Sequence, residues 1–177
     1  MRKWIPMLLC LLLMSGCSGP QLERQTFTVE LGQDVYANAA LYIKNPDQYP
    51  TDDWNVEAKT SGVIKKENRF ISKNLDYLVV GQYDFEIDTG KSNIDFAISI
   101  KDTQAPTIES YESNVTVKQN ESIDWSKYIE ASDLSGVSFA ITSDFDNSKL
   151  GIQDVTLRIS DRFGNAAQRT IHVTVIV

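Results

Sequence analysis

Three aspartates are the residues of this chain that are best suited to chemistry. Asp102, Asp133 and Asp161 each stand among turn-forming residues rather than inside an apolar pattern. Carboxylate oxygens on loops are typical ligands of Ca²⁺, which takes about six to eight oxygens. Three carboxylates supply only part of that shell, and an aspartate in a turn also caps its own backbone. The sequence therefore leaves a calcium site and three separate turn caps as alternatives.

Turn capping is the stronger alternative for Asp161, which precedes Arg162-Phe163-Gly164-Asn165. A short hairpin loop needs residues with positive φ, and Gly and Asn adopt that conformation most readily. We expect Gly164 and Asn165 to supply it.

The chain offers few other groups for catalysis. His172 is the single histidine, and it stands between Ile171 and Val173. The strand pattern turns those two residues toward the core, so we expect His172 on the outer face. The acidic pairs at 52–53 and 144–146 lie in turn-like segments, where we expect solvated carboxylates with ordinary pKa values. The sequence has no phosphate-binding glycine loop, nucleophile elbow or His-Glu-x-x-His motif, which predicts a protein that is not an enzyme.

The first 17 residues have the composition of a secretory signal. Two cations precede an apolar stretch from Trp4 to Met14, and small residues follow. The apolar stretch is short for a membrane span, which needs about 20 residues. The end of the segment, Ser15-Gly16-Cys17, resembles the lipobox of bacterial lipoproteins, although Met14 stands where Leu is usual. The resemblance implies a signal peptide of residues 1–16 and a palmitate-bearing diacylglyceryl group on Cys17. An ordinary signal that leaves a free thiol is the alternative.

A lipidated Cys17 predicts a lipid anchor at the extracytoplasmic face of the cell membrane, with the bilayer as the first partner. It also removes sulfur chemistry from the mature chain, because Cys10 lies inside the signal and no disulfide can form. Residues 17–26 are predicted to be a lipidated tether that leads to the first folded residue. The net charge is −7 and no run of cations exceeds two residues, which argues against nucleic acid as a partner.

Alternating apolar residues mark two hairpins, with turns at residues 88–92 and 161–165. Period-2 apolar runs that flank a glycine-containing turn predict antiparallel strands with one buried face. The alternating residues are Tyr83, Phe85, Ile87, Ile94, Phe96, Ile98 and Ile100 in the first hairpin, and Val155, Leu157, Ile159, Ile171, Val173 and Val175 in the second.

The second hairpin repeats the first. Gly81 through Ile87 aligns with Gly151 through Leu157 at an offset of 70 residues. Similar parallels upstream predict two copies of one domain, residues 27–101 and 102–177. The seam ends at Pro106, which fixes its own φ and favours an extended residue before it, so we expect a short, stiff connection.

Each copy holds about seven short segments separated by turn residues. This predicts an all-β protein made of two tandem immunoglobulin-like β-sandwiches. Helix should be limited to single turns at Asp47–Trp54 and Asp124–Tyr128. The second copy resembles the Ig-like domains of bacterial surface proteins and the related hyalin-repeat (HYR) modules. The resemblance rests on Asp102-x-x-Ala-Pro106, Ala131-x-Asp-x-Ser-Gly136, the hairpin from Gly151, and Asp161-x-x-Gly-Asn165. The first copy lacks the second and fourth elements, so its membership rests on the repeat.

The resemblance implies non-catalytic modules for binding, adhesion or spacing at the cell envelope, with an unknown protein or glycan as partner. The alternative is an accessory or inhibitory subunit of an envelope complex or of a secreted enzyme. The aspartate before the linker is similar to that of calcium-bridged tandem β-sandwiches. That likeness implies a calcium site between the domains, formed by Asp102, Asp133 and Asp161.

Residues 44–54 form the longest irregular segment, and it belongs to the first copy only. Tyr49 and Trp54 lie among its turn residues. Rigid sandwiches bind through their loops, so the two rings are candidates for an aromatic binding patch. The alternative, which we favour for Trp54, is packing as an ordinary core residue of a strand.

Overall fold

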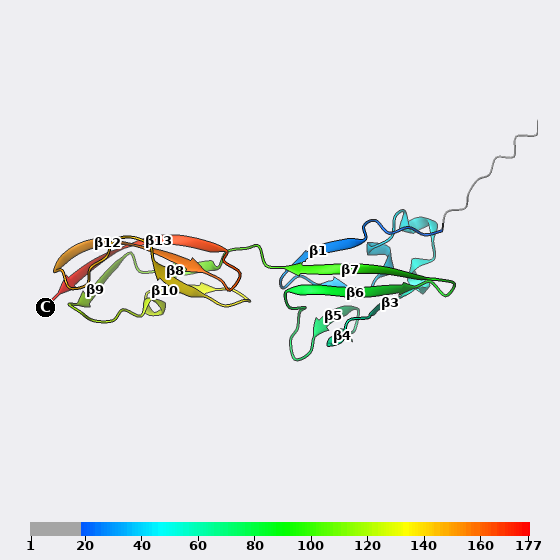
Figure 1. The fold of residues 1–177 in the computed structure, drawn as a ribbon, viewed down its shortest axis with the longest axis horizontal. Helices are drawn as coiled ribbons and strands as arrows, with labels where there is room; N and C mark the ends of the chain where they lie inside the picture. Colours follow the sequence, from blue (N-terminus) through cyan, green and yellow to red (C-terminus); the bar gives the residue numbers. More distant parts are fainter. Residues whose placement is uncertain (1–18) are drawn as a thin grey trace, which may run out of the picture.

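The structure is a computed structural model that describes residues 19–177, so the signal segment and Cys17 lie outside the described residues. The described chain forms an N-terminal lobe (residues 19–101) and a C-terminal lobe (residues 107–177), which lie end to end with residues 102–106 between them (Figure 1). No helix among the described residues is long and apolar enough to cross a membrane.

Strands account for nearly all of the regular structure, as predicted. The N-terminal lobe contains β1 (Thr26–Glu30), β2 (Val35–Tyr36), β3 (Asn55–Ala58), β4 (Val63–Lys66), β5 (Arg69–Ser72), β6 (Gly81–Asp88) and β7 (Asn93–Lys101). The C-terminal lobe contains β8 (Thr107–Tyr111), β9 (Asn114–Lys118), β10 (Ile129–Ser132), β11 (Ser138–Ile141), β12 (Gly151–Ser160) and β13 (Ala166–Ile176). Four 3₁₀ turns complete the fold: η1 (Ala39–Leu41), η2 (Pro46–Gln48), η3 (Thr51–Asp53) and η4 (Trp125–Lys127).

The two lobes share one sheet plan. One sheet of the N-terminal lobe has the order β1-β7-β6-β3, and its counterpart in the C-terminal lobe has the order β9-β13-β12-β11. In both, the first pair is parallel and the other pairs are antiparallel. The facing sheets are β2-β5-β4 and β10-β8. This arrangement is that of an immunoglobulin-like sandwich, in which the C, F and G strands share one sheet.

Burial follows the predicted alternation, and it produces two separate hydrophobic clusters. The first cluster centres on Phe85 and Ile87, and the second on Val155, Leu157 and Ile159, all with exposed fractions of 0 %. Antiparallel strands place alternate side chains on the buried face, so each predicted hairpin supplies the middle of one cluster. The predicted alternation is therefore confirmed in both hairpins.

The 3₁₀ turns also repeat. Asn38 caps η1 by accepting a hydrogen bond from the Ala40 amide at 3.0 Å, and Asp124 caps η4 through the Ser126 amide at 3.2 Å. Short polar side chains stabilise a helix start in this way. The turn predicted at Asp124–Tyr128 is confirmed by η4, and the segment Asp47–Trp54 contains most of η2 and all of η3.

Two expectations need correction. The segment predicted as a tether, residues 17–26, is paired with the lobe from Gln21 onward, because the Glu23 amide donates to the Tyr42 carbonyl and the Lys44 amide donates to the Gln21 carbonyl, each at 2.8 Å. The two lobes also differ in strand number. The N-terminal lobe has seven strands and the C-terminal lobe has six, because β4 and β5 have no counterpart between β11 and β12, whereas β8 has only the single bridge of Leu22 with Ile43 as its counterpart.

Candidate cation site between the lobes

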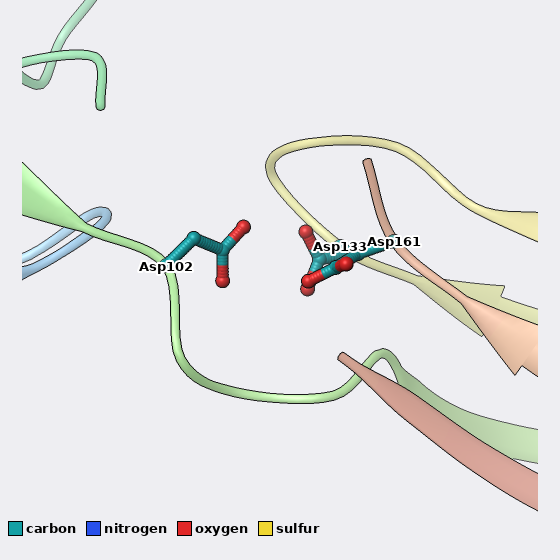
Figure 2. Close-up of side chains that lie close together, drawn as sticks. All are labelled: Asp102, Asp133 and Asp161. Carbon is teal, nitrogen blue, oxygen red and sulfur yellow. The ribbon is translucent and has the colours of Figure 1, made fainter. Parts of the chain in front are cut away.

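The three aspartates that the sequence singled out lie together where the lobes meet. Asp102 follows β7, Asp133 follows β10 and Asp161 follows β12. One carboxylate oxygen from each lies within 4.8 Å of the other two. Figure 2 shows the carboxylate of Asp102 directed toward the other two from the segment that connects the lobes. The sheet plan explains the meeting, because the turns after β10 and β12 lie at the end of the C-terminal lobe that faces the connecting segment (Figure 1).

Asp133 and Asp161 both act as turn caps, as the alternative interpretation predicted. Asp133 Oδ1 accepts hydrogen bonds from the amide and the hydroxyl of Ser135, each at 2.7 Å. Asp161 Oδ1 accepts from the amides of Phe163 at 2.9 Å and Asn165 at 2.8 Å. An aspartate that bonds its own backbone two residues on is the usual Asx turn. These bonds hold both carboxylates in fixed orientations.

Asp161 is almost fully buried, with an exposed fraction of 7 %. Burial by itself would raise the pKa of its carboxyl. Hydrogen bonds from the Asn165 side chain and from the turn amides outweigh burial and hold the pKa of Asp161 below its usual value. The group is therefore an anion at neutral pH.

Asp102 differs from the other two, because turn capping does not account for it. Its Oδ2 atom is the one buried side-chain nitrogen or oxygen within residues 19–177 that has no hydrogen-bond partner. Its Oδ1 atom lies 3.5 Å from Asn165 Nδ2, at the limit for a hydrogen bond. Buried polar atoms nearly always find a partner, so an orphaned carboxylate oxygen calls for a specific explanation.

Asn165 is the site residue that the sequence argument missed. Its side-chain amide donates to the Asp102 carbonyl at 3.0 Å and to Asp161 Oδ2 at 2.7 Å, so it joins the connecting segment to the turn after β12. The sequence predicted positive φ for both Gly164 and Asn165. Gly164 has φ +93°, but Asn165 is not among the residues with positive φ. The prediction was correct for Gly164 and wrong for Asn165, whose side chain has the structural role.

The N-terminal lobe also contacts the connecting segment and the C-terminal lobe beside the aspartates. Glu30, at the end of β1, accepts hydrogen bonds from the amide and the hydroxyl of Thr103, each at 2.7 Å. These bonds lower the pKa of Glu30. Leu134 lies against Gly32, so that a Cβ on Gly32 would stand 2.5 Å from Leu134 Cδ1. A crevice of about 350 Å³ between the lobes has Asp102, Asp133 and Leu134 in its lining.

The donor set fits a hard divalent cation. It consists of carboxylate oxygens, without sulfur or imidazole, and this is the set that Ca²⁺ and Mg²⁺ prefer. The oxygens converge from three separate segments, and Asp102 Oδ2 has no other partner. Anionic oxygens this close together repel one another, and a cation among them would turn repulsion into attraction.

The other predicted site residues are not part of this cluster. Tyr49 and Trp54 contact each other with ring centroids 5.8 Å apart, and both pack, partly buried, against the N-terminal cluster. The core alternative for Trp54 is correct in its packing but not in its element, because Trp54 is only partly buried and precedes β3. His172 is exposed on the outer face, as predicted, and its Nδ1 lies 2.6 Å from Asp154 Oδ1 on the neighbouring strand.

The acidic pairs considered for acid–base work are solvated. Asp52, Asp53, Asp144 and Asp146 are all exposed, as predicted. One detail of that expectation was wrong, because hydrogen bonds from the hydroxyl and the amide of Ser148 lower the pKa of Asp146. A lowered pKa makes a carboxyl a poorer proton donor near neutral pH, which is the opposite of what a general acid needs.

Comparisons with known proteins give weak likenesses only. No family model matches the chain, and no curated protein matches it. Among solved structures, the chain is similar over 89 % of its length to Sidekick-1 immunoglobulin domains 1–4, at 13 % identity, 49 % coverage of that chain and a TM-score of 0.38. Similar values hold for Drosophila OTK extracellular domains 3–5 (12 %, 62 % and 0.37) and for the protocadherin GammaB4 extracellular domain (14 %, 32 % and 0.32). The chain spans less than two thirds of each of these structures.

Proposed function

We propose that the chain is a lipid-anchored protein of the extracytoplasmic face of the cell membrane that carries two tandem immunoglobulin-like domains, residues 27–101 and 102–177, as non-catalytic modules for binding, adhesion or spacing. The observation that carries the proposal is the pair of sandwiches, each with its own hydrophobic cluster and the same sheet order, placed end to end. Such a plan presents loops and strand edges at increasing distance from the anchored end.

The anchor is Cys17 in this proposal. Two or more acyl chains give stable membrane attachment, because each buried CH₂ contributes about 0.8 kcal/mol. Metabolic labelling with palmitate followed by membrane fractionation tests the anchor. The unchanged protein should carry label and pellet with membranes, and Cys17→Ala should lose both. A Cys17→Ala protein that still carries label would reject the anchor without touching the proposal for the two domains.

A second role, as an accessory or inhibitory subunit of an envelope complex or secreted enzyme, is favoured by one observation. Tyr49 leaves part of its ring exposed beside Trp54 on the segment 44–54, where loops of a rigid sandwich make contacts. Crosslinking and pull-down of the full-length protein from membranes separates the two roles. A stoichiometric protein partner lost in Tyr49→Ala supports the accessory role, whereas binding to intact cell walls or glycans supports adhesion. Turnover of any substrate in a broad hydrolase panel would overthrow both.

The aspartate cluster is proposed to hold Ca²⁺ between the domains. Asp102 would contribute the connecting segment's ligand, and Asp133 and Asp161 would contribute those of the C-terminal domain, with water completing the shell. The orphaned Oδ2 of Asp102 supports this reading. The cation would supply charge neutralisation and a bridge, while Asn165 keeps Asp161 and the connecting segment in register through its two hydrogen bonds.

A further inference from the structure

The C-terminal lobe leaves one side of its sandwich open. In the N-terminal lobe, the chain between β3 and β6 forms the hairpin β4–β5, which extends the second sheet beside β2. The corresponding chain in the C-terminal lobe, residues 142–150, is much shorter and forms no strand. As a result, β10 pairs only with β8. β11 is the outer strand of its sheet, as β3 is in the N-terminal lobe.

A groove of about 800 Å³ lies along this open side. Tyr128, Ile129 and Ala131 line it from the β10 side, and Val137 and Phe139 line it from the β11 side. These five residues give the groove an apolar part, and Ser110, Glu112, Ser126, Lys127 and Glu130 make most of the rest of its lining polar. Its polar lining includes the carboxylates of Glu112 and Glu130 and one amine, that of Lys127.

The backbone of β11 offers unused hydrogen-bonding groups at its free edge, where Phe139 lines this groove and Ile141 lines the neighbouring cavity. The Thr142 amide donates to the Thr156 carbonyl of β12 at 2.8 Å. In an antiparallel pair, successive residues point their amides and carbonyls to opposite edges. Ala140 therefore faces β12 as Thr142 does, whereas Phe139 and Ile141 direct their amides and carbonyls to the free edge.

The N-terminal lobe shows what covers the equivalent edge. Val56 of β3 pairs with Ile87 in the position that Ile141 of β11 holds opposite Leu157. The Val56 carbonyl accepts a hydrogen bond from Lys65 Nζ of β4 at 3.3 Å, and Lys65 also donates to Asn55 Oδ1 at 2.9 Å. The edge of β3 is therefore also free of strand pairing, and a lysine side chain of β4 covers it within the chain itself.

The edge of β11 has one feature that protects an outer strand, its short length of four residues, and it has no charge, proline or covering element. Natural proteins block such edges with lysine, proline or a covering element. The sequence of β11 is Ser-Phe-Ala-Ile, without charge or proline, and Ile141 is 42 % exposed. An uncovered edge beside a partly apolar groove is the geometry that proteins use to bind a partner by strand addition.

We propose that the free edge of β11 and the adjoining groove bind one extended, cationic strand of a protein partner. The guest strand pairs with the outward amides and carbonyls of Phe139 and Ile141. Its apolar side chains enter the groove against Tyr128 and Ile129, and its cations meet the carboxylates of Glu112 and Glu130. The net charge of −7 favours the same partner. This inference rests on the proposed binding role, but it needs neither the anchor nor the cation site.

A peptide that copies residues 63–72, which carry two lysines and one arginine, is the probe. The full-length protein in detergent micelles is followed by hydrogen–deuterium exchange with mass spectrometry. Exchange in residues 138–142 should slow by a factor of about 1 + [L]/Kd as peptide is added. A peptide with Lys65→Glu, Lys66→Glu and Arg69→Glu should protect the segment at least about tenfold less well at equal concentration.

The matched variants act on one backbone group. Ile141→Pro removes an outward donor while it leaves the bonds to β12, and proline is tolerated at strand edges. It should abolish protection, whereas Ile141→Val should keep it. Ile141→Lys blocks the edge by charge, and it serves as the second variant if the proline variant loses the slow exchange of β12 and β13.

Four results would overturn the inference. The first is no protection of residues 138–142 at about 1 mM peptide, the weak end of specific affinity. The second is equal protection in the edge-blocked variants. Protection without peptide that grows with protein concentration would assign the edge to a second copy of the chain. Protection at another surface would leave the proposed binding role standing but would reject β11 as its site.

Discussion

The substitution Asp102→Asn should change the stability of the protein in opposite directions depending on calcium. Without a divalent cation, it removes one of three negative charges that lie within 4.8 Å of one another, so the melting temperature should stay equal or rise. With calcium, it removes the ligand whose Oδ2 is buried without a partner, so the melting temperature should fall below that of the unchanged protein. A turn cap alone predicts no such change of sign.

The size of the effect follows from linkage. Calcium sites of extracellular modules have dissociation constants of about 10⁻⁴ to 10⁻³ M. At about 10 mM calcium, binding to the folded state alone then stabilises it by roughly 1.4 to 2.7 kcal/mol. For a chain of this size that energy raises the melting temperature by about 3 to 10 °C. The Asp102→Asn protein should lose most of that rise.

Differential scanning calorimetry of the full-length protein, with calcium or with chelator, measures this directly. The matched control is Asp88→Asn, because Asp88 Oδ1 caps the turn of the first hairpin through the Gly90 amide at 2.7 Å and lies outside the cluster. Asp88→Asn should keep the full calcium effect. Identical melts of the unchanged protein with calcium and with chelator would refute the cation site, and so would an equal loss of the calcium effect in both variants.

Three further predictions concern the rest of the fold. Phe85→Ala and Leu157→Ala each remove a fully buried side chain from a different cluster, and each should lower the free energy of unfolding by about 3 to 5 kcal/mol. If the clusters belong to independent domains, each variant should shift only one of two calorimetric transitions. A single shared transition would contradict independent domains. Hydrogen bonds hold the pKa of Asp161 below its ordinary value of 3.8, so its contribution to stability is present above that value and is lost as the pH falls through the lower folded pKa. Between about pH 6 and about pH 3, the urea midpoint should therefore fall more steeply in the unchanged protein than in Asp161→Asn. Equal slopes in the two proteins would contradict this prediction. Gly32 has φ +85°, and a Cβ there would meet Leu134, whose side chain is 56 % exposed and free to rotate away. Gly32→Ala should therefore lower the free energy of unfolding by about 1 kcal/mol through the backbone alone, both in the unchanged protein and in a Leu134→Ala background. Urea unfolding measures this cost, and an unchanged midpoint would contradict it.

The two predicted hairpins could be found from the sequence because the alternation of buried and exposed residues appears within a short stretch of the chain. The spacing of Tyr83, Phe85 and Ile87 is enough to place them on one face of a strand, and no distant contact is needed for that prediction. The hairpin β4–β5 was missed for the opposite reason. Its sequence, from Val63 to Ser72, does not alternate, and the positive φ of its two-residue turn falls on Glu67, at +55°, rather than on Asn68. Its position is determined by tertiary pairing of β5 with β2, which a local pattern does not contain.

The sequence predicts which aspartates form the candidate cation site, but it does not predict the contacts that hold them there. The motifs around Asp102, Asp133 and Asp161 identified the three residues, because turn-forming neighbours accompany each of them. The bridging role of Asn165 depends on the approach of the turn after β12 to the connecting segment, 63 residues away in sequence. The orphaned oxygen of Asp102 likewise depends on burial by both lobes. Neither fact has a counterpart in residue spacing.

The differences between the lobes indicate where their functions should differ. The sheets β1-β7-β6-β3 and β9-β13-β12-β11 have the same order and directions, because a buried face tolerates little change. The segments that join the strands are under no such constraint, and they differ most. Between β3 and β6 the N-terminal lobe has the hairpin β4–β5, whose Lys65 donates to the Val56 carbonyl at the edge of β3, and between β11 and β12 the C-terminal lobe has no strand. The partner of β11 should therefore resemble β4 in its chemistry more than it resembles any ligand of the shared sheet.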